Sequence, residues 1–157
     1  MPMTRLIQPN TLDDMLLYQL WHVQAAAGRT VMRMCETEYG ISRREWRMLA
    51  QLARDEGQTS SALAERAALD RAQTSRVVGR LVEKGLVVRT PRPSNRREVV
   101  LQLTESGRAL YAALLPRVAR INRDLLSTLS EAEVTALEDL LRRLRARAEG
   151  MADGSQA

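Results

Sequence analysis

The sequence predicts a mainly α-helical domain that carries one small β-hairpin. Apolar residues recur at helical spacing through most of the chain, and two short β-branched runs follow one another near its middle. No apolar run approaches the roughly 18 residues that a membrane span needs, so we expect no membrane partner. With 157 residues, 45% of them hydrophobic and 27% charged, the chain is long enough to bury a core as a single domain, residues 1–157.

Residue types that carry most enzyme chemistry are scarce. Cys35 is the only cysteine and His22 the only histidine, which excludes an intrachain disulfide and argues against a histidine-rich metal site. The sequence has no glycine-rich phosphate loop and no motif that pairs a nucleophile with a base. We therefore expect neither enzymatic activity nor a cofactor. Met1 to Asn10 lack the basic and apolar plan of a signal peptide, so a cytoplasmic location is the default expectation.

Two helices are predicted in the first third of the chain. Thr11 is a typical helix N-cap and acids follow in the first turn, so the first helix is expected to begin there and to end at Gly40. Ser42 and Glu45 form a capping-box pattern that opens a second helix, which Gly57 ends.

Two short helices and a hairpin are predicted next. Ser60 or Ser61 caps the first short helix, Leu69-Asp70 makes a tight turn, and the second runs from about Arg71 to Lys84. After Gly85, residues 86–90 and 98–103 form two strands, which the turn-rich and basic connector 91–97 joins.

Two further helices are expected toward the end of the chain. A long helix starts at Thr104 and bends near Pro116, because proline removes a backbone donor. Ser130 and Glu133 form another capping box that opens the last helix. Residues 150–157 are small and polar and are expected to be a flexible tail.

Positive charge is concentrated in one segment. The formal net charge is +5, but residues 71–97 carry eight cations and one acid, so this segment sums to +7 and the rest of the chain to −2. A localised basic segment is typical of nucleic-acid binding.

The helix predicted over residues 71–84 has two faces at about 100° per residue. Val77, Val78 and Leu81 lie on an aliphatic face, whereas a cationic face with one glutamine lies opposite. A solvated surface would explain that face if the helix stood alone. Together with the short helix before it and the basic hairpin after it, the helix instead fits a winged helix-turn-helix, whose second helix enters the major groove of double-stranded DNA.

Side chains expected to contact DNA lie on this helix and on the hairpin. Arginine suits guanine and glutamine suits adenine, so the polar face is assigned to the major groove through Gln73, Ser75, Arg76 and Arg80. Arg96 and Arg97 are assigned to a narrow minor groove, and Arg89 and Arg92 to phosphates. The complete predicted set is Arg71, Gln73, Thr74, Ser75, Arg76, Arg80, Arg89, Arg92, Arg96 and Arg97.

Residues 41–111 resemble the MarR (multiple antibiotic resistance regulator) family of dimeric bacterial repressors. The motifs that carry the resemblance are, in order, Ile41–Leu49, Ala62–Arg66 with Leu69–Arg71, Ser75–Val78 with Leu81–Arg89, Asn95–Arg97, and Leu103–Arg108. Two stretches depart from the family pattern. Ala72-Gln73-Thr74-Ser75 stands where the family often has Ser-Thr-Val-Thr, and Asn95 replaces an aspartate that orients a wing arginine, so Arg96 and Arg97 are expected to be held differently here.

The resemblance implies a homodimer that binds a pseudo-palindromic operator through residues 41–111. Residues 11–39 and 112–149 are expected to form the dimer, and both contain helices rich in leucine, methionine and valine. Dimer symmetry would place the two recognition helices roughly 34–36 Å apart, which is one turn of DNA.

The resemblance also implies a small aromatic acid as effector, of the benzoate, hydroxybenzoate or nicotinate type. Family members often bind such acids between the dimer helices and the DNA-binding lobe. Tyr18, His22 and Arg47 are the candidates for polar contacts, with Trp21 and Trp46 as apolar walls. An ordinary role in the protein core explains the same aromatic residues, and this alternative stays open.

Two other functions stay open as well. Some members of the family sense peroxides through a cysteine, but Cys35 has no clear activating context, and a small packed hydrophobe is the simpler interpretation. The charge argument alone also fits an architectural protein that binds DNA without sequence preference. Competition by random duplex separates that protein from a regulator.

Overall fold

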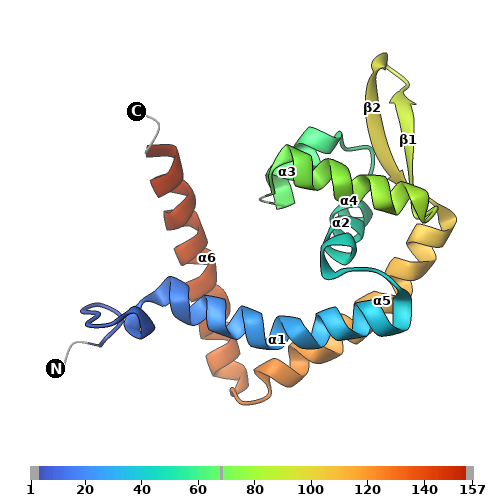
Figure 1. The fold of residues 1–157 in the computed structure, drawn as a ribbon. Coiled ribbons are helices and arrows are strands. Elements are labelled where there is room, and N and C mark those ends of the chain that lie inside the picture. Colours follow the sequence, from blue (N-terminus) through green and yellow to red (C-terminus); the bar gives the residue numbers. More distant parts are fainter. Residues whose placement is uncertain (1–3, 68, 155–157) are drawn as a thin grey trace. The chain divides into compact units, whose positions relative to one another are not determined.

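The computed structural model describes residues 4–67 and 69–154. It confirms the predicted fold class: six α-helices and one two-stranded antiparallel hairpin follow one another along these residues (Figure 1). The chain divides into two compact units, one up to Ala119 and one from Arg120 onward, and each is described by itself below. Among the described residues, no helix is both long and apolar enough to cross a membrane.

The first α-helix begins later than the sequence predicts. Thr11 caps a short 3-10 turn, Leu12–Asp14, in which the Asp14 carboxylate accepts hydrogen bonds from the backbone N–H groups of Asn10 (3.0 Å) and Thr11 (3.1 Å). Met15 is extended, with ψ at 130°, so the turn cannot continue as a helix. Helix α1 (Leu16–Tyr39) starts after it and ends at Gly40, whose φ of 64° lies in the left-handed region that favours glycine.

Side-chain caps define the next three helices. The Ser42–Glu45 capping box of α2 (Arg43–Arg54) is confirmed, with Ser42 Oγ accepting from the Glu45 N–H at 3.1 Å. Helix α3 (Ser60–Ala67) is capped by Thr59, whose hydroxyl accepts from the Ala62 N–H at 3.2 Å, so the predicted caps Ser60 and Ser61 are wrong. Helix α4 (Arg71–Glu83) begins after Asp70, whose carboxylate accepts from the Gln73 N–H at 2.7 Å.

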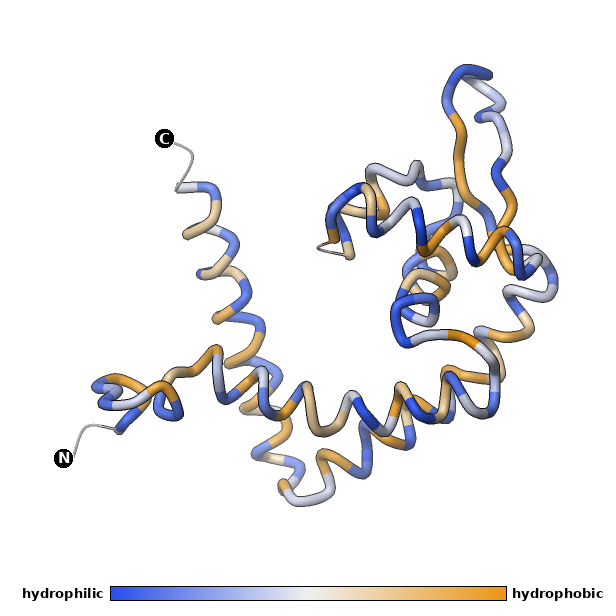
Figure 2. Tube along the Cα trace, viewed as in Figure 1, coloured by the Kyte–Doolittle hydropathy of each residue, from blue (hydrophilic) through white to orange (hydrophobic). Residues whose placement is uncertain are grey.

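The hairpin has longer strands and a shorter tip than predicted. Strands β1 (Val87–Arg92) and β2 (Asn95–Leu103) pair antiparallel, with Val87 opposite Leu103 and Arg92 opposite Asn95. The long connector predicted over residues 91–97 is therefore wrong, because most of it is strand. Proline has no backbone N–H to donate to a neighbouring strand. Pro91 is tolerated here because β1 is an edge strand, in which part of the N–H groups face away from the partner strand. Figure 2 shows that the tip of this hairpin is hydrophilic.

The core of the first unit lies beneath this hairpin and helices α2 to α4. Its most deeply buried apolar side chains, each at most 1% exposed, come from both helices and strands: Met48, Leu49, Leu52, Leu63, Val78, Leu81, Val87, Leu101 and Leu114. The loop before α3 joins the sheet, because the Leu101 N–H donates to the Gln58 carbonyl at 2.8 Å and the Gly57 N–H donates to the Leu101 carbonyl at 3.0 Å. This core holds α4 and the hairpin in one rigid arrangement.

The last two helices have little core of their own. Helix α5 (Glu105–Leu126) is capped by the Thr104 hydroxyl and continues through Pro116, and its residues from Arg120 onward belong to the second unit. The predicted Ser130–Glu133 capping box is confirmed at the start of α6 (Glu131–Gly154), with the Ser130 N–H donating to Glu133 at 2.8 Å. Helix α6 passes Gly150, where a tail was expected, and residues 155–157 of that tail lie outside the described residues. No residue from Glu131 to Gly154 is buried.

Candidate nucleic-acid interface

Helix α4 separates an aliphatic face from a cationic one. Val77, Val78 and Leu81 are buried at 5% exposure or less, and they hold the helix against the core. The opposite side is polar and exposed except for the half-buried Gln73, and it consists of Arg71, Gln73, Ser75, Arg76 and Arg80. Asp70 already accepts a hydrogen bond from the first turn of the helix, so this surface is built from side chains and not from a free helix N-terminus.

Thr74 does not belong to this polar surface. Its side chain is fully buried, and it lies on the same side of α4 as Val77 and Val78. A buried side chain cannot reach a base or a phosphate, so the prediction that Thr74 contacts DNA is wrong. A helical wheel of this sequence predicts the burial, because at about 100° per residue Thr74 lies on the same side as the aliphatic residues.

Two cations of the basic segment are engaged in ion pairs within the protein. Lys84 Nζ lies 2.9 Å from a carboxylate oxygen of the buried Glu45, and Arg92 Nε lies 2.5 Å from Glu98 Oε2. Arg92 also donates to the Gly57 carbonyl at 3.4 Å, which ties the hairpin to the loop before α3. Arg92 therefore joins the two strands of the hairpin to each other and to the loop before α3. The sequence analysis assigns Arg92 to a phosphate and not to this structural role.

The other six cations of the segment are exposed, and none of them forms an ion pair with another described residue. They are Arg71, Arg76, Arg80, Arg89, Arg96 and Arg97. Arg76 also donates from Nε to the Ala72 carbonyl at 3.3 Å, a contact that holds its guanidinium along the helix. Six unneutralised guanidinium groups on one helix and one hairpin are well suited to the phosphates and base edges of DNA.

At the hairpin tip, Asn95 replaces an orienting aspartate with a local backbone bond. Its side-chain oxygen accepts from the Arg97 N–H at 3.2 Å and so shapes the turn. Arg96 and Arg97 are consecutive residues of β2, and consecutive strand residues point to opposite faces of the sheet. The two side chains therefore lie on opposite faces of the hairpin.

The predicted effector residues do not form one cluster in a single chain. The rings of Tyr18, Trp21 and His22 contact one another, with centroids 4.5 to 5.7 Å apart, near the beginning of α1. Trp46 is instead buried and stacks on Tyr111 with centroids 5.6 Å apart, and its role as a pocket wall stays a prediction.

Arg47 is exposed and lines a different feature, a groove of about 430 Å³ between α1 and α2. Residues lining the groove are Met32, Glu36, Ser42, Arg43, Arg44, Arg47 and Leu69. Three arginines against one glutamate make the groove cationic, which favours an anionic occupant. Of the five predicted effector residues, Arg47 alone lines this groove.

Cys35 lies in the core of the first unit. Its side chain is fully buried, and burial raises the pKa of the Cys35 thiol, to which the nearby Glu36 adds and which Arg43 opposes. A raised pKa leaves less thiolate, the form that reacts with peroxides. The environment of Cys35 is therefore that of a packed hydrophobe.

Two acids, to which the sequence analysis assigns no role in the DNA-binding surface, form ion pairs with cations of the basic segment. Glu98 pairs with Arg92 in the hairpin, and Glu45 pairs with Lys84 at the end of α4. The capping-box pattern predicts the local bond of Glu45 to Ser42 but carries no signal for a partner 39 residues further along the chain. Only the packing of α2 against α4 brings Glu45 and Lys84 together.

Comparison with known proteins identifies the family of the chain. Residues 39–98 match the model of the MarR family. A putative transcriptional regulatory protein for the hcr operon of Thauera aromatica is 36% identical over 127 residues, which cover 81% of this chain and 76% of that protein. The HTH-type transcriptional repressor NicR of Pseudomonas putida is 38% identical over 92 residues, 58% of each chain.

One solved structure of similar fold contains operator DNA. The crystal structure of a mutant MarR from E. coli complexed with operator DNA is 26% identical to this chain, with a TM-score of 0.75 over 86% of this chain and 99% of that one. Family match, curated relatives and solved structure all point to one class of protein. The chain therefore belongs to the MarR family of winged helix-turn-helix transcriptional regulators.

Proposed function

We propose that the protein is a dimeric repressor, released from a pseudo-palindromic operator by a small aromatic acid. One observation carries the DNA-binding part of this proposal: the six exposed, unpaired arginines of the basic segment all lie on α4 and the hairpin. Similarity to a relative named as a repressor and to a structure complexed with operator DNA supports it.

Each group of DNA contacts has a separate task in the proposal. Gln73, Ser75, Arg76 and Arg80 read base edges in the major groove, where bidentate arginine and glutamine contacts discriminate between bases. Arg71 and Arg89 bind phosphates, which gives affinity without sequence information. Arg96 and Arg97 approach the minor groove from the hairpin tip. Arg92 acts indirectly, through the ion pair with Glu98 that stiffens the hairpin.

The apolar surfaces of the terminal helices support a homodimer. In α1, Leu17 is 80% exposed and Trp21 55%, and in α6 Leu140 is 50% exposed and Leu144 43%. Figure 2 shows hydrophobic residues alternating with hydrophilic ones along α6, as expected of a helix with one apolar stripe. Apolar surface of this kind marks an interaction site in a soluble protein. We propose that residues 11–39 and 112–149 cover it with the same segments of a second copy, while residues 41–111 bind DNA.

Two features support an aromatic acid as the effector. The ring cluster of Tyr18, Trp21 and His22 offers planar surfaces and a hydroxyl group, and the groove beside Arg47 offers positive charge. A benzoate-, hydroxybenzoate- or nicotinate-type acid has a planar ring, which suits the ring cluster, and a carboxylate, which suits the cationic groove. The redox alternative has less support, because the thiol of Cys35 is buried and its pKa is raised.

Selection of bound DNA from a random pool tests the repressor proposal. The full chain is mixed with random duplexes, the bound fraction is recovered and sequenced, and the affinity for the recovered site is compared with that for random duplex at fixed salt. A regulator is expected to prefer its site by about 10³-fold or more. Equal affinity for both duplexes would instead establish the architectural alternative.

A thermal-shift panel tests the effector proposal separately. Wild-type protein is heated with benzoate, hydroxybenzoate and nicotinate, and any stabilising acid is then tested for release of the recovered operator. Stabilisation is expected to disappear in Tyr18→Phe or Arg47→Ala, and to persist in Arg108→Ala, whose ion pair with Glu56 lies outside both candidate subsites. If no acid of the panel raises the melting temperature, this effector class is wrong, whereas the DNA-binding proposal stands.

A further inference from the structure

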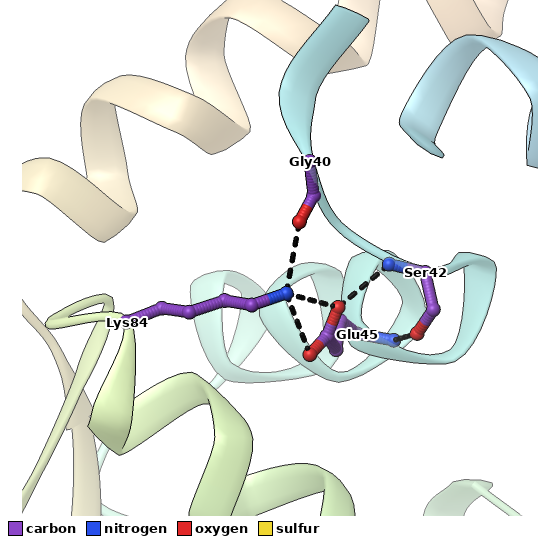
Figure 3. Close-up of polar contacts among 4 residues, drawn as sticks. All are labelled: Gly40, Ser42, Glu45 and Lys84. Atoms are coloured by element: carbon purple, nitrogen blue, oxygen red, sulfur yellow. Dashed lines mark hydrogen bonds and ion pairs between the residues drawn. The ribbon is translucent and has the colours of Figure 1, made fainter. Parts of the chain in front are cut away.

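The end of α4 is joined to two other helices by a single ammonium group. Lys84 Nζ donates to both carboxylate oxygens of Glu45, at 2.9 and 3.0 Å, and to the Gly40 carbonyl at 2.9 Å (Figure 3). Two of these acceptors are the oxygens of one carboxylate, so Lys84 makes one chelated contact with Glu45 and one hydrogen bond with Gly40. Lys84 is also the only lysine of the chain, in which every other cationic side chain is arginine.

Glu45 belongs to two contacts at once. Its side chain is 2% exposed, and the same carboxylate that binds Lys84 accepts from the Ser42 N–H at 2.6 Å, as the cap of α2 (Figure 3). Gly40, the third member, is the residue at which α1 ends. The contacts of Lys84 therefore join the end of α1, the beginning of α2 and the end of α4, and we call these three residues the Lys84 junction.

Hydrogen bonds to the buried carboxylate of Glu45 give the Lys84 junction a directionality that the surrounding apolar contacts lack. Val78 and Leu81 attach α4 to the core through non-directional packing, which tolerates small rotations and shifts of a helix. A charged hydrogen bond to a buried carboxylate has a defined geometry, and a buried charge that loses its partner is strongly disfavoured. The junction therefore favours one placement of α4 relative to the end of α1.

We propose that Lys84 is a positioning residue for operator binding, one that sets the distance between the two recognition helices of the dimer. This inference rests on the proposed dimeric function, in which α1 carries part of the dimer surface and α4 reads the DNA. Gly40 lies at the end of α1 and Lys84 at the end of α4. Because the two residues are in contact, a change in the position of α1 in the dimer would also move α4. The side chain of Lys84 is 38% exposed, so the experiment has to separate an effect on the placement of α4 from a direct contact with a phosphate.

A series of operators with altered spacing tests the proposal. The operator recovered by selection is synthesised with its half-sites moved apart or together by one and by two base pairs, and affinity is measured for wild type, Lys84→Met and Glu45→Gln. Wild type is expected to prefer the natural spacing sharply. Both variants are expected to lose about tenfold or more at that spacing and much less at the others, which flattens the profile.

Salt dependence distinguishes positioning from direct contact. If Lys84 only positions α4, the slope of log affinity against log salt is the same in Lys84→Met as in wild type. Arg89→Ala is the matched comparison, because Arg89 is proposed to bind a phosphate and loss of a phosphate contact lowers that slope by about 1. Circular dichroism and sedimentation establish that each variant is folded and dimeric, and Glu45→Gln, which keeps an oxygen to accept from Ser42 N–H, covers the case in which Lys84→Met does not fold.

The outcomes separate this inference from the proposed function. A sharp spacing preference in wild type that persists unchanged in both folded variants would overturn the positioning role and leave the repressor proposal intact. A slope that falls by about 1 in Lys84→Met with an unchanged spacing profile would also overturn it, because Lys84 would then contact phosphate directly. A wild-type protein with no spacing preference would overturn the dimeric function itself.

Discussion

The winged-helix region and the last helix place their apolar side chains in opposite ways. From α2 to β2, leucine, methionine and valine side chains such as Met48, Leu81 and Leu101 are buried, and arginines occupy the surface. In α6 no residue is buried, and Leu140, Leu141 and Leu144 are 42–50% exposed.

This difference indicates what each region requires to be stable. The winged-helix region encloses its own core, so its exposed side chains are available for a charged partner. The apolar stripe of α6 needs another surface to cover it, because contiguous exposed apolar area is costly in water. We propose that the winged-helix region binds DNA and that the apolar stripe of α6 binds a second copy of the chain, and four predictions follow from this comparison.

The largest effect is expected from a charge placed on the apolar stripe. Leu141→Asp should prevent dimer formation, since a carboxylate would have to be buried in an apolar interface. Operator affinity should then fall by about 10² or more, because each chain binds a half-site without the benefit of the second. Sedimentation velocity and operator titration measure the two effects.

Ala146→Asp is the matched control for Leu141→Asp. It adds the same carboxylate to α6, on the side of the helix away from the stripe, and Ala146 is exposed. The control should remain dimeric. If both variants stay dimeric, the stripe is not the dimer surface.

The second prediction concerns the polar face of α4. Arg76→Ala should weaken operator binding by about 10- to 100-fold and relax the base preference at one position, because a bidentate arginine contact discriminates by about 1–3 kcal/mol. Fluorescence anisotropy at fixed salt measures the loss. Arg108→Ala removes one positive charge from the exposed pair with Glu56 and should change affinity far less. Equal losses in the two variants would mean that net charge alone, and not the position of Arg76, accounts for binding.

The third prediction compares a glycine of the enclosed region with one of the exposed helix. A Cβ at Gly107 would lie 2.1 Å from the Leu86 carbonyl oxygen, so Gly107→Ala forces α5 and the start of β1 apart and should destabilise the fold by about 1–3 kcal/mol. A Cβ at Gly150 meets no described atom within 4 Å, and Gly150→Ala should stabilise by up to about 1 kcal/mol. Urea unfolding measures both, and a shift of the same sign would contradict the comparison.

The smallest effect is expected at the start of α6. Hydrogen bonds from the Ser130 backbone N–H and hydroxyl lower the pKa of Glu133. A lowered pKa means that ionised Glu133 stabilises the folded state above the ordinary glutamate pKa of about 4.3, and that this contribution is lost as the pH falls through the lowered value. Ser130→Ala removes the hydroxyl and should make stability slightly less dependent on pH in this acidic range. Urea midpoints measured across this pH range for wild type and Ser130→Ala give the difference. Identical pH profiles would rule out a contribution from the Ser130 hydroxyl.

Local patterns in the sequence predict most of the fold. Both capping boxes, Ser42 with Glu45 and Ser130 with Glu133, are present in the structure, because a cap depends on residues three positions apart. The wheel of α4 likewise separates Val78 from Arg76 correctly. Errors arise where local chemistry permits two outcomes: Thr11 and Asp14 cap a 3-10 turn as readily as an α-helix, and Pro91 fits an edge strand as well as a loop.

Contacts between distant residues are what the sequence does not predict. The pairing of Lys84 with Glu45 neutralises a charge that the sequence analysis counts toward the DNA-binding surface, and Trp46 stacks on Tyr111, a contact that no local pattern predicts. Both contacts join residues far apart in the chain, so only tertiary packing determines them. The Arg92–Glu98 pair is closer in sequence, but it depends on the short hairpin tip, which the pattern of turn residues overestimates.

Titration of the recovered operator with the full chain, followed by the mass of the complex, tests the central claim most directly. The intact operator should bind two chains at nanomolar protein concentrations, and an operator with one half-site scrambled should lose about 10² or more in affinity. Binding of single chains to intact and scrambled operators with equal affinity would contradict the account.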